Sequence, residues 1–212
     1  MGRISEVVKN LIIINVIFFL GSNLLMLPNG GLIPMESLAL ALHFPLSDGY
    51  QHYQIVTHMF MHAGLGHLFF NMLGLFFFGP PLENLWGSKR FLFFYLAAGF
   101  GAALIHVLFS YYEYAYGGVP VNQIYPALGA SGAVYGVFVG FAILFPKEKV
   151  MLLIPPIPMR ASVLVLLLIG YDLFSGISGA GTGIAHFAHL GGAFFGALMV
   201  LYWKNKGKGY SQ

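Results

Sequence analysis

The chain has 212 residues, of which 58% are hydrophobic and 8% are charged, and its formal net charge is +3. A soluble domain carries about 25% charged residues, so this composition excludes an ordinary soluble protein and predicts a polytopic membrane protein. Cysteine is absent, which excludes a disulfide framework and a thiol nucleophile.

Six apolar runs are long enough to cross a bilayer, which takes about 20 residues per helix. They cover residues 10–27, 58–79, 91–109, 129–145, 161–177 and 185–203. The first is too long for a signal-peptide core and lacks a small-x-small cleavage site. Glycine- and proline-rich breakers separate the runs, among them Gly79-Pro80-Pro81. We therefore predict an all-α, six-helix membrane bundle forming a single domain over residues 1–212.

Lysine and arginine are confined to one side of this predicted topology. All ten lie in the two termini or in the connections 80–90 and 146–160, whereas loops 28–57, 110–128 and 178–184 contain none. By the positive-inside rule both termini are cytoplasmic. The small positive charge reflects this orientation, so we expect no nucleic-acid partner.

The same topology gathers polar residues of three helices near the outer surface. These are His58, His62, His67 and Asn71 of the second run, Ser131 of the fourth, and His186 and His189 of the sixth. A hydroxyl or imidazole inside an apolar helix is costly unless it has a partner or faces water. The gathering therefore predicts a functional site that opens to the outer side.

Stripes of small residues in the fourth and sixth runs predict how the two helices pack. The stripes are Gly132, Gly136 and Gly140 in the fourth run, and Ala188, Gly192 and Gly196 in the sixth. Packing along them would bring Ser131 Oγ within hydrogen-bond reach of a His189 ring nitrogen, as a nucleophile and its base require. Tyr135, one turn below Ser131, would stack on that ring and orient it without an aspartate.

An acyl-transfer site also needs donors for the developing oxyanion. His67 and Asn71 are four residues apart and share one helix face. The backbone N–H of Ser131 is a further donor near a helix N-terminus. One such donor is worth about 3–4 kcal/mol of transition-state stabilisation.

The histidines and Asp172 also allow other interpretations. His58 and His62 have zinc-ligand spacing, but neither a His-Glu-x-x-His motif nor a nearby carboxylate completes a site, so we predict no metal there and read both as structural hydrogen-bonding residues. His186, three residues before His189, competes with it as the base. Asp172 follows Tyr171 as in half of an intramembrane aspartyl site, but the partner Gly-x-Gly-Asp is missing. We therefore expect Asp172 to cap or anchor its helix.

These residues together resemble the rhomboid intramembrane serine proteases in their minimal six-span bacterial form. The matching motifs are His67-Leu68-Phe69-Phe70-Asn71, then Gly129-Ala130-Ser131-Gly132 with Tyr135, and then Ala188-His189 with Gly192 and Gly196. The last motif favours His189 over His186, whose corresponding glycine positions hold His189 and Ala193.

The resemblance implies that Ser131 attacks a peptide bond and that His189 takes its proton. It places His67, Asn71, Gly129 and Ala130 at the oxyanion and substrate-binding side, with no cofactor. Supporting roles fall to Tyr135, His62, His58 and Gly192. The resemblance also implies that Glu83 makes a structural helix-end contact and that loop 28–57 lies partly in the outer leaflet.

Two further functions were considered. The first is a catalytically silent relative that binds membrane proteins for quality control; such relatives lose the serine or the histidine, and this chain keeps both. The second is a small transporter, which a missing two-fold repeat disfavours. The expected partners are therefore transmembrane protein substrates and the lipid bilayer.

Overall fold

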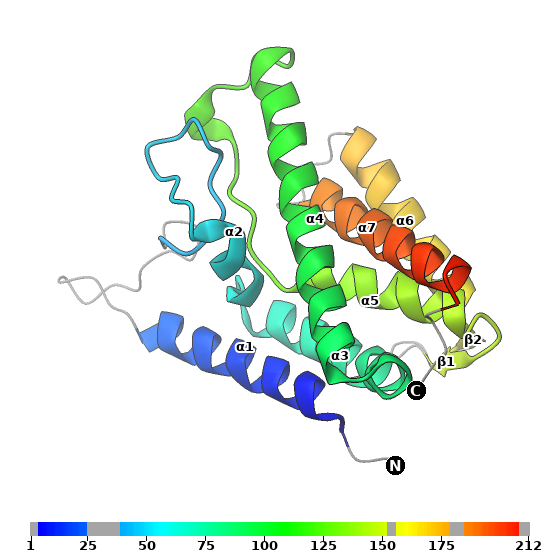
Figure 1. Ribbon diagram of the computed structural model, residues 1–212. Helices are drawn as coiled ribbons and strands as arrows, with labels where there is room; N and C mark the ends of the chain where they lie inside the picture. Colours follow the sequence, from blue (N-terminus) through cyan, green and yellow to red (C-terminus); the bar gives the residue numbers. More distant parts are fainter. Residues whose placement is uncertain (1–3, 25–38, 152–155, 179–184, 208–212) are drawn as a thin grey trace.

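The computed structural model describes residues 4–24, 39–151, 156–178 and 185–207, and over these residues the chain is a bundle of six long helices (Figure 1). The long helices are α1 (Glu6–Leu24), α3 (Leu65–Trp86), α4 (Ser88–Ala115), α5 (Ser131–Leu144), α6 (Ala161–Ser178) and α7 (His186–Asn205). The short elements are α2 (Gln54–Thr57), η2 (His58–Phe60), η3 (Val121–Gln123) and the antiparallel strands β1 (Lys149–Met151) and β2 (Pro158–Arg160). The predicted all-α architecture is confirmed.

The exterior of the bundle is apolar, as a lipid-facing surface must be. Helices α3, α4 and α6 are each long and apolar enough to cross a membrane, and α5 is a shorter apolar helix. Several large side chains on these and neighbouring helices are more than half exposed: Phe69, Phe70, Phe77, Phe93, Phe174 and Ile177. Soluble proteins rarely expose so large an apolar surface to water, so the chain is a membrane protein.

The second long helix differs from its prediction, which covered 58–79. Helix α3 begins at Leu65, because Met61 has an extended backbone (φ −89°, ψ 144°) and ends the short η2 segment. It then continues through Pro80 and Pro81 to Trp86. Proline is tolerated in membrane helices where the surrounding protein compensates for the lost N–H. The end comes at Gly87, whose φ of +79° turns the chain into α4.

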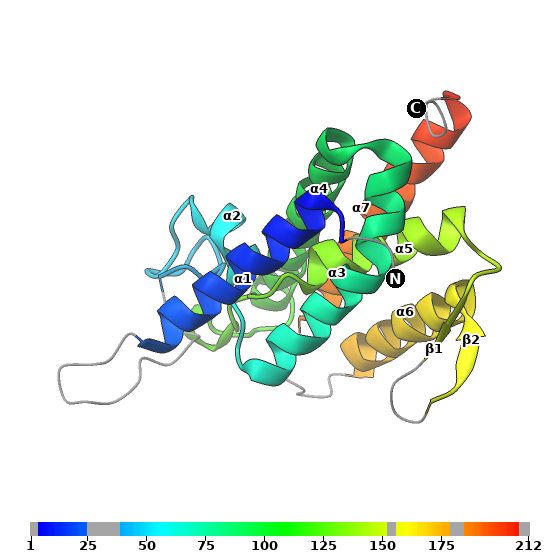
Figure 2. The ribbon, with the colours of Figure 1, turned by 90° about the horizontal axis from the view of Figure 1, so that it is seen from below.

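Close backbone contact between α5 and α7 forms the centre of the bundle. A Cβ on Gly192 would lie only 1.9 Å from the carbonyl oxygen of Gly132, and one on Gly196 would lie 2.7 Å from Gly136 Cα. The small-residue stripes therefore meet as the sequence predicts, except that Gly140 faces Phe94 of α4. Helix α6 lies outside this centre, beside the β1–β2 hairpin (Figure 2).

Loop residues 39–53 pack against the outer part of the bundle around one buried amide. Gln54 is fully buried, and its Nε2 donates to the carbonyls of Ala39 and Gly49, while its Oε1 accepts from His43 N. An antiparallel bridge joins Leu42 to Ala127, directly before α5. The loop between α1 and α2 is thereby attached to the segment that leads into Ser131, although residues 25–38 of this loop lie outside the described part of the chain.

The basic connections meet at the opposite end of the bundle, where Glu83 joins two helices. Its carboxylate accepts hydrogen bonds from the N–H groups of Val7 (2.9 Å) and Val8 (3.0 Å) in the first turn of α1, and from Ser88 Oγ (2.7 Å). A carboxylate at a helix N-terminus satisfies N–H groups that have no partner within the helix. Glu83 therefore makes the helix-end contact that the family resemblance implies.

Glu83→Ala should lower the stability of the fold, because two backbone N–H groups of α1 lose a charged acceptor in a buried place. Hydrogen bonds to charged groups are worth about 1.5–3 kcal/mol, so we expect a loss of that order in thermal unfolding of the detergent-solubilised protein. Glu148→Ala, at an exposed position on the same end of the bundle, is the control. Equal melting temperatures for the two variants would contradict the role of Glu83.

Candidate active site

Ser131 is the first residue of α5, and the segment before it is tightly constrained. Ala130 is fully buried and is the N-cap of α5. Gly129 has a φ of +126°, and its N–H donates to the carbonyl of His58 (2.8 Å). Because the first N–H groups of a helix have no intrahelical acceptor, the Ser131 N–H is free of helical bonding. Ser131 thus offers both a hydroxyl that could act as a nucleophile and a free backbone N–H that could donate a hydrogen bond.

His189 in the first turns of α7 lies directly opposite Ser131. Its Nε2 is 2.8 Å from Ser131 Oγ. The Tyr135 ring stacks on the imidazole, with centroids 4.3 Å apart and an interplanar angle of 14°. The closeness of α5 and α7 at Gly192 is what allows this reach, because any side chain there would separate the helices.

Asp172 of α6 is the residue that sequence reasoning missed. It is buried, and its Oδ1 lies 3.1 Å from His189 Nδ1 and 2.5 Å from His186 Nδ1. Of the two roles expected for Asp172, capping its own helix is wrong, because the side chain reaches α7 and there anchors α6. Its predicted position near the outer end of the fifth span, at the depth of both histidines, was the available signal. Of the two histidines, His189 contacts Ser131, while His186 contacts Asp172 and stands edge-on to Tyr171.

His67 of α3 lies near the Ser131 hydroxyl. A Cβ placed on Gly129 would lie 2.9 Å from His67 Nε2 and 3.4 Å from Ser131 Oγ, so only glycine leaves room for both groups. Asn71, one turn further along α3, donates from Nδ2 to the His67 carbonyl (2.9 Å). An amide nitrogen carries two hydrogens, so this bond leaves Asn71 a second donor.

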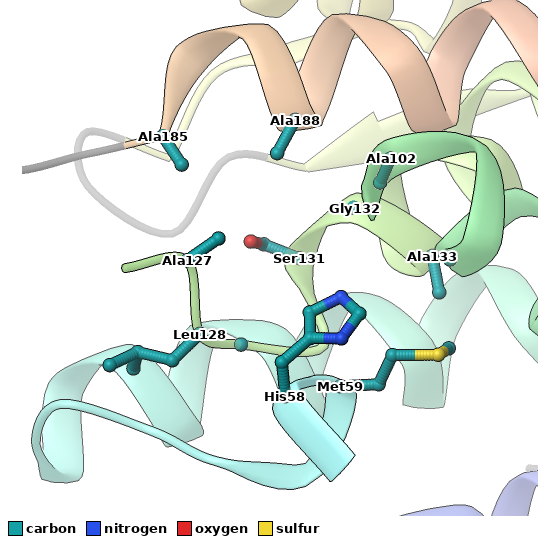
Figure 3. A pocket seen from close by; sticks show the side chains of 12 residues that line it. His58, Met59, Ala102, Ala127, Leu128, Ser131, Gly132, Ala133, Ala185 and Ala188 are labelled. Atoms are coloured by element: carbon teal, nitrogen blue, oxygen red, sulfur yellow. The ribbon is translucent and has the colours of Figure 1, made fainter. Parts of the chain in front are cut away.

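A small cavity of about 20 Å³ adjoins Ser131 and is lined by residues of α4, α5, α7 and the segments that precede α3 and α5. Figure 3 shows the Ser131 hydroxyl pointing into the space between Ala127 and Ala188, with the His58 ring below it. Its lining is mostly apolar, with Ser131 and His58 as the polar side chains, and its volume leaves room for one water molecule.

His58 and His62 lie in the connection before α3, not on the outer half of a spanning helix as predicted. Burial lowers the pKa of His58 to about 4, and burial together with the nearby His67 lowers the pKa of His62 to about 4. Both rings are therefore neutral at physiological pH. His58 Nδ1 donates to the Gln54 carbonyl (2.8 Å), which leaves Nε2 as an acceptor. His62 is fully buried and packs edge-on against His67, with centroids 5.0 Å apart.

One cluster in the described part of the chain has the donors to hold a metal ion. The ligand atoms of Asp172, His186 and His189 lie within 4.8 Å of one another. In this structure these atoms satisfy each other by hydrogen bonds, as the two short N···O distances indicate. The absence of a metal remains a prediction from the sequence.

Comparison with known proteins gives the family of the chain. A family model for the rhomboid domain matches residues 49–206. The rhomboid protease AarA of Providencia stuartii is 33% identical over 148 residues, which are 68% of this chain and 53% of AarA. The mitochondrial Rhomboid protein 1 of Saccharomyces cerevisiae is 32% identical over 148 residues, 70% of this chain and 41% of the relative. The rhomboid protease GluP of Bacillus subtilis is 30% identical over 149 residues, 70% of this chain and 26% of GluP.

This chain thus covers 26% to 53% of the length of these relatives. The matched region nevertheless contains the loop before α3 and every helix that contributes to the Ser131 site, from α3 to α7. The chain belongs to the rhomboid family.

Proposed function

We propose that this protein is an intramembrane serine endopeptidase that cleaves transmembrane segments of other membrane proteins near their outer ends. The observation that carries the proposal is the 2.8 Å contact between Ser131 Oγ and His189 Nε2. Two polar groups from helices far apart in sequence meet inside an apolar bundle, where neither would be stable alone.

In the proposed reaction Ser131 Oγ attacks the scissile carbonyl while its proton passes to His189 Nε2. The imidazolium then gives this proton to the leaving amine, and the acyl group stays on Ser131 as an ester. The Ser131 N–H, His67 and the second amide hydrogen of Asn71 are the proposed oxyanion donors, with Gly129 and Ala130 forming the wall beside them. Each donor aimed at the developing charge is worth about 3–4 kcal/mol.

Water must then hydrolyse the ester, and the cavity beside Ser131 is the proposed source. Its volume suits one water molecule, and the neutral His58 ring offers Nε2 as an acceptor toward it. His189 again acts as base and takes a proton from this water as the water oxygen attacks the acyl carbon. The bond from that carbon to Ser131 Oγ then breaks, the imidazolium gives its proton to Oγ, and the product leaves as a carboxylic acid. The role of His62 in this proposal is to pack against His67 and hold that ring in place.

The depth of the site suggests the substrate class. With 14 residues, α5 is about 21 Å long, shorter than the roughly 30 Å hydrocarbon core. Ser131, at its outer end, would then lie below the membrane surface. A peptide bond within a helix is shielded, so we propose that substrates unwind locally and carry small or helix-breaking residues at the cleaved bond.

The basic residues support the proposed orientation. The connections that carry Lys89, Arg90, Lys149 and Arg160 lie at the end of the bundle away from Ser131, together with the C-terminal end of α7. By the positive-inside rule this end faces the cytoplasm, and the site opens to the other side. We propose a bacterial inner membrane as its location.

A fluorophosphonate probe tests the enzyme directly, because it reacts with activated serine hydroxyls. We expect the full-length protein in detergent or liposomes to be labelled, and Ser131→Ala to remove the label completely. Ser175→Ala, which removes a buried hydroxyl on α6, should keep full labelling. Failure of the folded wild-type protein to label would favour the alternative, a catalytically silent rhomboid-like factor that binds membrane proteins.

A further inference from the structure

Asp172 is the one inward-facing charged group on the outermost helix of the site. Helix α6 buries only Ala161, Val165, Asp172 and Ser175 among its described residues, whereas Leu166, Phe174 and Ile177 are largely exposed. A carboxylate inside an apolar bundle is expensive unless it is paired and hydrogen-bonded. Asp172 is paired mainly with α7, by its contacts with His186 and His189, and the Tyr135 hydroxyl of α5 is a further hydrogen-bonding partner of the carboxylate.

The hydrogen-bond roles around Asp172 define the tautomer of His189. An ionised carboxylate only accepts, so His189 Nδ1 must carry the proton in the 3.1 Å contact. A neutral imidazole protonated at Nδ1 has its lone pair on Nε2, the nitrogen that lies 2.8 Å from Ser131 Oγ. The tautomer that the Asp172 contact requires is therefore the one that accepts the serine proton.

His186 holds the carboxylate in place for this role. Its Nδ1 lies 2.5 Å from the same oxygen, Oδ1, that faces His189. Because His186 and His189 are both on the first turns of α7, their two N–H groups approach Oδ1 together and limit how the carboxylate can turn. The Tyr135 ring also stacks on the face of the His189 imidazole.

We propose that Asp172 is a positioning residue for His189, forming with Ser131 a serine–histidine–aspartate line that makes the orientation of the base depend on the seating of α6 against α7. This inference rests on the proposed function. The serine proton goes to His189 Nε2 and from there to the leaving amine, while Asp172 stays ionised and takes no proton. When α6 moves away from α7, the carboxylate leaves His189, and only the Tyr135 stacking still orients the ring.

Asp172→Asn tests the positioning role through turnover. The corresponding aspartate-to-asparagine change in a soluble serine protease lowers kcat by about 10⁴; here the Tyr135 stack retains part of the ring orientation, so we expect a roughly 10- to 100-fold lower kcat. KM for a transmembrane reporter substrate should stay within about twofold, because Asp172 does not touch Ser131 or the proposed oxyanion donors. Asp172→Glu should restore part of the rate, and Ser175→Ala, one turn away on α6, should leave it unchanged.

The NMR signal of the His189 Nδ1 proton tests the contact itself, independently of catalysis and of variant folding. In protein with ¹⁵N-labelled histidine we expect a downfield Nδ1–H signal from each of His186 and His189, the first lost in His186→Ala and the second in His189→Ala, whereas the signal of His58 Nδ1–H stays in both variants. Absence of the His189 signal from folded wild-type protein would overturn the inference, as would an Asp172→Asn enzyme with wild-type kcat. If the signal is present but wild-type protein neither labels nor cleaves, the proposed function fails while the contact stands.

Discussion

Ser131→Ala and His189→Ala should each abolish cleavage of a transmembrane substrate, whereas His186→Ala should keep much of the wild-type rate. Removing either member of a nucleophile–base pair in a serine protease lowers turnover by about 10⁶. The difference between the two histidines follows from geometry, since His189 Nε2 contacts Ser131 Oγ and His186 contacts the carboxylate of Asp172. Cleavage of a fluorescent reporter segment in liposomes measures all three variants under the same conditions.

His186→Ala is the matched control in this set, because it removes the same ring from the same turn of α7. Circular dichroism and thermal unfolding of each variant establish that lost activity is not lost folding. An inactive His186→Ala together with an active His189→Ala would show that the base has been assigned to the wrong histidine. Residual cleavage by Ser131→Ala would show that another nucleophile does the chemistry.

Gly192→Ala should have the largest structural effect of an added methyl group among the glycines that the structure describes. Its Cβ would lie 1.9 Å from the Gly132 carbonyl oxygen, a backbone atom that cannot move aside as a flexible side chain does. Helices α5 and α7 must therefore separate. Overpacking of this kind costs about 1–3 kcal/mol and sometimes more. The 2.8 Å Ser131–His189 distance must lengthen as well, so we expect at least about a 100-fold loss of activity, as an ångström-scale misplacement produces.

Gly170→Ala in α6 is the control for this prediction. A Cβ there meets no heavy atom within 4 Å, so the same chemical change in a helix should leave melting temperature and cleavage rate near the wild-type values. Both are measured on detergent-solubilised protein, and the rate again in liposomes. A Gly192→Ala protein as stable and active as Gly170→Ala would show that α5 and α7 are not in backbone contact.

The sequence predicted the helices well where hydropathy is continuous and less well where a breaker interrupted it. The run 161–177 matches α6 (Ala161–Ser178) almost to the residue. The run 58–79 instead became a connection followed by α3, which begins at Leu65 after the extended Met61 and continues past Pro80 and Pro81, the predicted helix end. Local breaker rules describe a chain in water, whereas a packed membrane helix retains its proline residues. Because α3 begins only at Leu65, His58 and His62 lie before this helix and not within it as predicted. His58 still lines the cavity beside Ser131, and His62 still packs against His67.

The candidate site divides in the same way. Short motifs and the small-residue stripes were enough to predict that α5 and α7 meet and that Ser131 and His189 face each other, because helical periodicity fixes which residues share a face. The contact of Asp172 was beyond such reasoning. This contact depends on how α6 is rotated about its axis and how closely it approaches α7. The pattern of apolar and polar residues within α6 predicts neither quantity.

The amino-acid sequence by itself therefore determined that this chain enters a membrane as a helical bundle, with its basic residues at one end and its serine and histidines near the other. Hydropathy, charge and glycine spacing are local properties of the chain, so the features that they determine can be predicted from the order of the residues alone. Only the tertiary structure decided where α3 begins, how close His189 lies to Ser131, and that Asp172 accepts hydrogen bonds from α7. These are distances between separate helices, set by packing across the whole bundle.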